Sequence, residues 1–291
     1  MMYLRRKRQQ KRLAAQASEW MAATNAANNR SGGVMKLLLL ACAAVLLASP
    51  ARAQDSDDYR VRVGLGAQLR PQFKGADDRE VAPLVDVDIA RGADPFRFEA
   101  PDDSFAIALV SGKGFAAGPA ANLESSRKES DVGAPVGKVP ATFEAGAFAE
   151  FLPTENFRLR SELRKGIGGH GGVVGSVGGD YIVRDADRYV LSIGPRLLFS
   201  DGRYQRSFFG VDPAAAAASR LPLYRPGGGI HAAALTSGLS YQFNPRFGLF
   251  GFARYERLVG DAARSPIVRQ LGSRNQMSAG AGLSYTFTVR R

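Results

Sequence analysis

Residues 277–287 read Met-Ser-Ala-Gly-Ala-Gly-Leu-Ser-Tyr-Thr-Phe, and this stretch decides the fold. Its odd-numbered residues are apolar or aromatic, whereas its even-numbered residues are glycine, serine or threonine. In an extended strand the two kinds therefore lie on opposite faces. The same alternation recurs in 61–69, 143–151 and 157–163. Recurrent segments of about ten residues with this period are typical of strands that cross a membrane in a β-barrel.

The connections between these segments separate a barrel from a soluble sandwich. Counted back from the last strand, long connections alternate with tight turns: 259–276, 244–246, 201–231, 185–187, 166–171, 153–156 and 123–141. Bacterial outer-membrane barrels have short periplasmic turns and longer external loops. The sequence therefore predicts an all-β fold, a closed antiparallel transmembrane barrel of about 12 strands, with 10 as the alternative. The strands are expected at 58–70, 80–90, 95–99, 104–111, 113–122, 142–152, 157–165, 172–184, 188–200, 232–243, 247–258 and 277–287.

The first part of the chain has the plan of an export signal. Residues 35–53 contain a basic residue, an apolar run and a small-x-small ending at Ala51-Arg52-Ala53, which predicts a signal peptide cleaved before Gln54. The apolar run is too short to span a membrane as a helix. It continues past Cys42, which disfavours a lipoprotein. Residues 1–34 are expected to be a mis-assigned upstream extension, and 54–291 the outer-membrane barrel.

The net charge of +12 does not indicate a nucleic-acid partner, because much of it lies in the leader. Beyond residue 53 the chain has 30 Lys/Arg against 26 Asp/Glu, a balance of only +4. Cys42, the only cysteine, also lies in the leader, so we expect no disulfide and no thiolate metal site in the mature chain.

Charged residues inside the strand pattern are expected to face the lumen, because a charge in the middle of the bilayer costs about 2 to 4 kcal/mol. Such charges form a weakly ion-selective pore or a ladder of ion pairs that fills a narrow interior, and we favour the ladder. If the turn at 153–156 pairs residues whose numbers sum to 308, Glu150 lies opposite Arg158 and Glu144 opposite Arg164. The predicted lumen charge ladder is Arg60, Arg62, Glu144, Glu150, Arg158, Arg160, Glu162 and Arg164.

Candidate catalytic and metal-binding residues are few. Neither His170 nor His231 lies in a local Ser/Asp motif that would supply a nucleophile. Neither has a second metal ligand at a useful spacing in the sequence. The glycine-rich stretch 166–179 lacks the ending of a phosphate loop. We therefore expect no enzyme, no metal and no cofactor. Five consecutive alanines in Pro213–Arg220 favour a short helix in a long external loop.

The last third of the chain resembles the MipA/OmpV family of outer-membrane proteins. The resemblance is carried by Phe208–Val211, Ser219–Gly229, Leu258–Ala263, Ser265–Val268 and Gly272–Gly280. Before these residues it is looser and consists of the strand pattern and Glu144–Phe148.

Within the last strand, Gly282, Tyr285 and Phe287 resemble the terminal signal that the barrel assembly machinery recognises. Four further residues follow Phe287, which departs from the usual terminal phenylalanine.

The family resemblance implies a non-enzymatic protein of the Gram-negative outer membrane. It also implies the expected partners: outer-membrane lipid, the barrel assembly machinery, and a lytic transglycosylase and murein synthase held on a scaffold. Other members of the family are described as porin-like or adhesion-related. A scaffold for murein (peptidoglycan) enzymes and a porin-like channel for small solutes therefore both remain open, and family membership fixes location better than activity.

Overall fold

The computed structural model describes residues 58–290. The expected extension at 1–34, the signal peptide at 35–53 and the cleavage before Gln54 lie outside the described residues. Among residues 58–290, no helix is both long enough and apolar enough to span a membrane.

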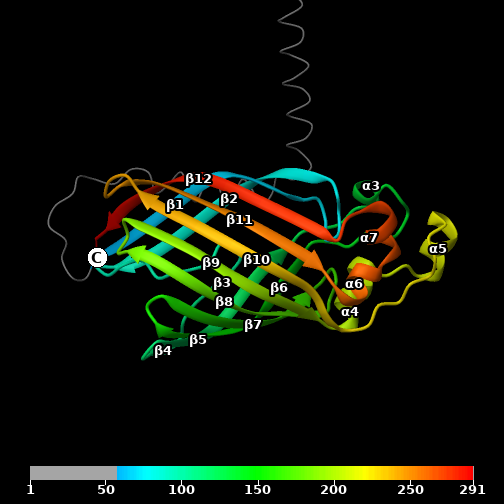
Figure 1. The fold of residues 1–291 in the computed structure, drawn as a ribbon, viewed down its shortest axis with the longest axis horizontal. Coiled ribbons are helices and arrows are strands. Elements are labelled where there is room, and N and C mark those ends of the chain that lie inside the picture. Colours follow the sequence, from blue (N-terminus) through cyan, green and yellow to red (C-terminus); the bar gives the residue numbers. More distant parts are fainter. Residues whose placement is uncertain (1–57, 291) are drawn as a thin grey trace, which may run out of the picture. The chain divides into compact units, whose positions relative to one another are not determined.

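One large antiparallel sheet dominates the described part of the chain and curls round on itself (Figure 1). Its order is β2-β1-β12-β11-β10-β9-β8-β7-β6-β5-β3, and β4 also pairs with β5. This confirms the predicted all-β antiparallel architecture. The strands are β1 (Tyr59–Pro71), β2 (Arg79–Arg91), β3 (Phe105–Ala106), β4 (Val110–Gly112), β5 (Phe115–Glu124), β6 (Thr142–Thr154), β7 (Phe157–Ile167), β8 (Val173–Asp185), β9 (Tyr189–Ser200), β10 (Gly229–Gln242), β11 (Phe247–Leu258) and β12 (Asn275–Val289).

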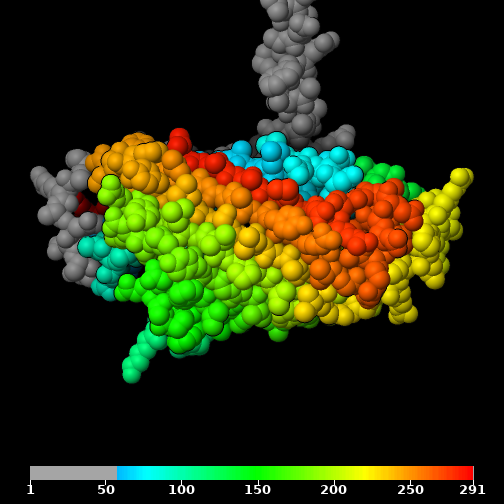
Figure 2. Space-filling model, viewed as in Figure 1, coloured from blue at the N-terminus to red at the C-terminus, as the bar shows by residue number. Residues whose placement is uncertain are grey.

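The two faces of the sheet differ as the alternation requires. On the outer face Leu65, Leu159 and Leu283 are exposed by 51%, 57% and 68%, whereas Arg158 on the inner face is 1% exposed. Figure 2 shows the outer face of β8 to β12, with the helical segments packed at one end of these strands. The curled sheet thus has an apolar exterior and a polar interior, the reverse of a soluble domain.

The predicted third strand at 95–99 is wrong. These residues have no strand partner, and 104–111 forms only the short fragments β3 and β4 along β5. The backbone N–H groups of Ile107 and Leu109 still donate to Pro119 and Ala117 of β5, so 105–112 is one interrupted strand. Residues 95–99 do carry the alternation of a strand, but ion pairs and ring contacts hold them inside the sheet, as described below.

Closure of the barrel by strand pairing stays a prediction. The described ladders leave β2 at one end of the sheet and β3 at the other. One side-chain contact does connect the two ends of the sheet. Lys74 Nζ, in the turn between β1 and β2, lies 3.7 Å from Glu124 Oε2 at the end of β5. The Glu124 carboxylate raises the pKa of Lys74 above 10.5, although burial of the ammonium acts in the opposite direction.

Among residues 58–290 there are five short helices, and they gather at one end of the strands, here called the helical end (Figure 1). They lie in the connections 125–141, 201–228 and 259–274. The predicted helix at Pro213–Arg220 is confirmed as α5, which Pro213 begins and the Asp212 side chain caps by accepting from Ala215 N. The helices are α3 (Glu129–Val132), α4 (Gly202–Phe209), α5 (Pro213–Ser219), α6 (Gly260–Arg264) and α7 (Pro266–Leu271).

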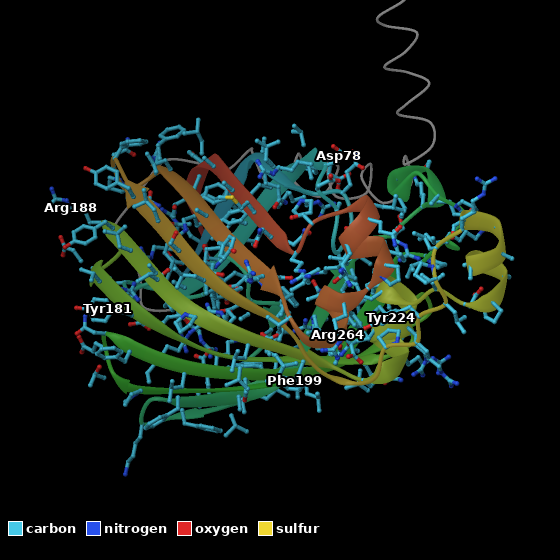
Figure 3. The ribbon with its side chains drawn as sticks, turned by 45° about the vertical axis from the view of Figure 1, so that its right-hand side comes forward. Asp78, Tyr181, Arg188, Phe199, Tyr224 and Arg264 are labelled. Atoms are coloured by element: carbon cyan, nitrogen blue, oxygen red, sulfur yellow. The ribbon has the colours of Figure 1, made fainter. Side chains whose placement is uncertain are left out.

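The opposite end carries the tight turns and is called the turn end. Figure 3 shows Arg188 and Tyr181 there, with Tyr224 and Arg264 at the helical end. The predicted β6–β7 register was wrong by two residues, because Glu150 pairs with Arg160 and not with Arg158. Thr154 pairs with Phe157 around a two-residue turn, and the register shifts between Phe151 and Thr154. A shift by two keeps every side chain on its face.

Candidate functional site

The interior of the curled sheet is crossed by residues 92–104, here called the strap. The strap starts where β2 ends, at the turn end, where Phe96 N donates to Asp187 Oδ1 at 2.9 Å and Arg184 Nη2 donates to Phe96 O at 3.1 Å. Asp187 lies in the turn between β8 and β9, far from β2 in the sheet order. The strap therefore spans the lumen from one wall to another.

Two carboxylates near the end of the strap anchor it to the inner wall. Asp102 accepts from Arg196 at 3.1 Å, from Thr236 at 3.0 Å and from Arg254. These three residues lie on β9, β10 and β11, so one carboxylate joins three neighbouring strands. The side chain is partly buried among them.

Asp103, the second anchor, lies 2.6 Å from Arg158 and 3.6 Å from Arg160 on β7. The next residue of the strap, Ser104, donates from its hydroxyl to Glu162. Together the two aspartates contact four arginines, all of them buried or partly buried. The strap is thus bound by charge-assisted hydrogen bonds, which are stronger than neutral ones.

Aromatic rings of the strap add contacts of a second kind. The guanidinium carbons of Arg60 and Arg62 lie 4.8 and 4.6 Å from the centre of the Phe96 ring, and that of Arg158 lies 4.7 Å from the Phe98 ring. Such cation–π contacts strengthen when water is excluded. Phe98 and Ala100 also pack on Ile182 of β8.

The inward charges of β6 and β7 form a continuous set of ion pairs. Arg160 Nη1 lies 3.0 Å from Glu150 Oε2, and its Nη2 lies 2.6 Å from Glu162 Oε1. Arg164 contacts both Glu162 and Glu144, the latter at 3.0 Å. Every carboxylate in this set is at least nine-tenths buried. Because an unpaired charge in such a place is very costly, the pairs hold one another in place.

The eight residues proposed from the sequence fall into two groups in space. Six of them, on β6 and β7, form the set just described together with Asp103 and Asp180. The two on β1 have other partners: Arg62 pairs with Asp88 of β2 at 2.8 Å, and Arg60 pairs with Asp187 at 2.9 Å across the turn end.

Sequence reasoning missed half of the network. Asp180, Arg196, Arg254 and Glu256 occupy inward positions of β8, β9 and β11, where the same alternation would have selected them. Arg158 and Arg196 both lie 2.7 Å from Asp180, and Arg254 lies 2.6 Å from Glu256. The strap carboxylates had no such signal, because Pro101-Asp102-Asp103 has the composition of an ordinary turn.

His170 closes the helical end of this network and is buried, with both ring nitrogens engaged. Its Nε2 lies 3.0 Å from Glu144 Oε1, and its Nδ1 accepts from Gly172 N at 3.0 Å. A ring that accepts at Nδ1 and donates at Nε2 is neutral. Tyr204 and Phe208 of α4 cover it, with ring centres 4.9 and 5.9 Å away.

The second histidine, His231, lies beside a serine but in no triad. Its Nδ1 is 3.0 Å from Ser200 Oγ, and both residues are buried beneath α4. The nearby Glu256 carboxylate is bound by Arg254 and forms no hydrogen bond with the imidazole among the described contacts. Nucleophilic catalysis needs an accessible serine and an oriented base. Among residues 58–290 no group of three or more His, Cys, Asp or Glu side chains is arranged to hold a metal ion.

The helical end is sealed by its own apolar core. Phe209, Ile267 and Val268 are no more than 1% exposed, and Arg127 donates to the carbonyl oxygens of Phe208 and Gly137 at 2.5 and 3.0 Å. Burial lowers the pKa of Arg127 to about 10, with Glu129 acting weakly against this shift. The loops of this end are therefore packed on one another like a small soluble domain.

A cavity of about 210 Å³ remains between the strap and β2. It is lined on one side by Leu84, Asp86 and Asp88 of β2, and on the other by Phe96, Phe98 and Glu99 of the strap. Most of the lumen charges are engaged in ion pairs, but Glu99 is exposed and has no hydrogen-bonded partner among the described residues. This cavity thus leaves free space in the interior beside the strap.

A family model described as MltA-interacting protein MipA matches residues 63–287. The chain belongs to this family. The match covers every described strand except the first residues of β1 and the last of β12, and it includes the strap and the helical end. Among curated proteins there is no match to the sequence.

Several solved structures of outer-membrane proteins are similar to parts of the fold. The COG4313 outer membrane channel from Pseudomonas putida F1 has a TM-score of 0.41 and 8% identity, covering 83% of this chain and 100% of that one. The KdgM porin has a TM-score of 0.34 and 10% identity, covering 79% and 99%. The N-terminal β-barrel domain of Pseudomonas aeruginosa OprF has a TM-score of 0.28 and 12% identity, covering 61% and 100%. Likenesses of this size carry no argument about function.

Proposed function

We propose that this protein is a non-enzymatic barrel of the outer membrane, which works by binding and serves as a scaffold for murein-synthesising and lytic enzymes. The observation that carries the proposal is the strap, because it crosses the lumen, is ion-paired to β7, β9 and β11 and is hydrogen-bonded to β10. A lumen occupied in this way is suited to a rigid platform rather than to bulk permeation. The family description, MltA-interacting protein, supplies the class of partner.

The outer face supports the membrane location. Aromatic side chains cluster on it near the turn end, with ring centres 5.1 Å apart for Phe157 and Tyr181, and 5.0 Å for Phe247 and Tyr285. Girdles of this kind lie at the membrane–water interface in outer-membrane barrels. With the short turns in the periplasm, this girdle marks the inner interface and the helical end faces outward.

The turn end is then the surface that murein enzymes meet. It consists of the turns after β2, β4, β6, β8 and β10, and carries exposed charges such as Lys113, Arg188 and Arg246. A rim of short turns offers a small contact area, so we expect a transient complex that buries less than about 1,200 Å² in total.

The test compares retention of a lytic transglycosylase with conductance in the same preparation. The mature protein in mild detergent is expected to retain the enzyme and to show no large stable currents in planar bilayers. Arg188→Glu with Arg246→Glu at the turn end should weaken retention at least tenfold. The matched control, Arg269→Glu with Arg274→Glu at the helical end, should retain the enzyme as the parent does. Large open-channel currents without enzyme retention would instead make the protein a porin-like channel.

A further inference from the structure

The edge of β2 that faces away from β1 is the starting point. β2 pairs with β1 from Arg79 opposite Pro71 to Arg91 opposite Tyr59, but no described strand pairs with its other edge. Val85, Val87 and Ile89 on its outer face are exposed by 52%, 53% and 63%. Hydrocarbon does not tolerate an unpaired strand edge, because each unsatisfied peptide group costs several kcal/mol there. At the proposed membrane location this edge therefore needs a partner.

The chain after β2 already turns back as a hairpin would. Asp94 N donates to Arg91 O at 3.0 Å around the two residues Gly92 and Ala93. Gly92 has a φ of +52° at the first central position, where type II′ hairpin turns place glycine. Only beyond Asp94 does the strap leave the line of the wall and enter the lumen.

Continuing this hairpin along β2 gives a register in which residue numbers sum to 185. Phe96 then faces Ile89, Phe98 faces Val87 and Ala100 faces Val85, so these six apolar side chains lie on the lipid face. Arg97 faces Asp88 on the lumen side. Directly opposed apolar pairs and opposite charges both stabilise a ladder. No other register of the same parity starts from the turn that is already formed.

Pro95, opposite Ala90, stands at the start of the strap's paired segment, a position at which sheets tolerate proline. Two other prolines limit the ladder at its far end. In the register of 185, Pro101 lies opposite Leu84, and Pro83 follows directly on β2. Proline has no N–H to donate, and within sheets it is confined to edges, strand starts and bulges. The pairing therefore extends over 84–91 and 94–101, the part of β2 nearest the turn end, and the cavity of about 210 Å³ separates these two segments in the structure.

We propose that residues 94–101 exchange between the lumen and the wall, and that the protein conducts small anions when they are in the wall. When the strap is in the lumen it blocks the path of ions through the barrel, and its carboxylates Asp102 and Asp103 are ion-paired with four arginines. In the wall the strap completes the sheet beside β2. The carboxylates withdraw from the middle of the lumen, which leaves an excess of guanidinium groups there and favours anions.

The charges explain why the lumen position is the resting one. The wall register sets Glu99 directly opposite Asp86, and like charges in that position oppose pairing. Leaving the lumen also breaks the contacts of Asp102 and Asp103 with buried arginines. Removing those two carboxylates should therefore shift the strap toward the wall. The inference rests on the membrane location proposed above but not on the murein partner.

Pairs of engineered cysteines test the exchange directly, because the sequence beyond residue 53 contains no cysteine of its own. Val87→Cys with Phe98→Cys joins the strap to β2 in the wall. Pro101→Cys with Gly238→Cys joins it to β10 in the lumen, where a Cβ on Gly238 would lie 2.8 Å from Pro101 Cγ. The matched control is Leu65→Cys with Val85→Cys, which face each other across β1 and β2 whatever the strap does.

The oxidised wall pair is expected to give stable currents whose reversal potential in a KCl gradient favours chloride, and reduction should abolish them. The oxidised lumen pair and the control pair should stay closed. Asp102→Asn with Asp103→Asn should speed cross-linking of the wall pair at least fivefold. The proposal is overturned if the control pair cross-links and the wall pair does not, in protein whose heat-modifiable mobility shows a folded barrel. It is equally overturned if the wall pair cross-links without current. Retention of the murein enzyme is measured in the same samples, so the two proposals fail separately.

Discussion

Arg158 Nη1 lies 2.6 Å from Asp103 Oδ2, and this buried ion pair joins a strand of the wall to the strap inside it. Arg158 also holds Asp180 at 2.7 Å. Replacing Arg158 with alanine would leave Asp103 with Arg160, at 3.6 Å, as its only ion-pair partner, and Asp180 with only Arg196. Removing one partner of a buried ion pair typically costs about 3 to 5 kcal/mol. We expect a clear loss in the free energy of unfolding, measured by urea titration of the barrel in detergent with circular dichroism.

The control for this variant is Arg70→Ala. Arg70 also pairs with a carboxylate, Glu80, at 2.9 Å, but both side chains are more than one third exposed. Exposed pairs of this kind contribute about 0 to 1 kcal/mol. Equal losses for the two variants would show that the lumen network does not carry the stability assigned to it.

Gly238 sets the distance between β10 and the strap. A Cβ at this position would lie 2.8 Å from Pro101 Cγ and 3.0 Å from Ser192 Oγ. The larger side chain of Gly238→Val should therefore push the strap away from β10. We expect a cysteine placed at the buried Ala100 to react faster with a water-soluble thiol reagent in this variant. Ser237→Val, on the outer face of the same strand, should leave the rate unchanged. Identical rates in both would mean that the strap is not packed against Gly238.

Tyr204 of α4 should make stability fall at high pH. Burial raises the pKa of its phenol well above 10.0, whereas in the unfolded chain the phenol titrates near that value. The folded state holds the proton more tightly than the unfolded state does. The contribution of the protonated phenol to the free energy of unfolding is therefore fully present below pH 10 and is lost as the pH rises towards the folded pKa. Tyr204→Phe should flatten this decline in urea titrations between pH 9 and pH 11. A parent and variant with parallel declines would assign the effect to other groups.

Processing of the leader is tested by N-terminal sequencing of the protein from outer-membrane fractions. The small residues Ala51 and Ala53 after the apolar run predict a mature chain that begins at Gln54. A mature chain that began at an acylated Cys42, or that kept residues 1–34, would contradict this expectation.

Most of the wall strands could be predicted from the sequence. A strand with one apolar and one polar face alternates apolar and polar residues, and this alternation is visible in each segment by itself. The strap shows where this reasoning stops. Residues 95–100 carry the same alternation as the wall strands, and local pattern alone places them in the wall. Their position in the structure depends on Asp102 meeting arginines from β9 and β11, contacts between residues 94 and 152 positions apart. No local pattern contains such partners.

The candidate site divides along the same line. The pairing of Glu150 with Arg160 follows from adjacent strands, and only the turn geometry at Thr154 and Phe157 displaced the expected register. Asp180, Arg196 and Glu256 were within reach of the same reasoning. Asp103 was not, because a carboxylate in a stretch with turn composition gives no sign that it will be buried.

The apolar core of the helical end has a consequence for the order of assembly. Phe73, from the first hairpin, and Ile267, from the last long loop, belong to the same buried cluster. Nearly two hundred residues separate them, so the cluster is complete only after the last strand pair has been inserted. With the helical end facing outward, as proposed above, the early loops expose their apolar side chains outside the cell until then. Burial of Phe73 therefore indicates that the whole chain has been inserted. A protease added outside the cell should cut incompletely inserted chains and leave fully inserted ones intact.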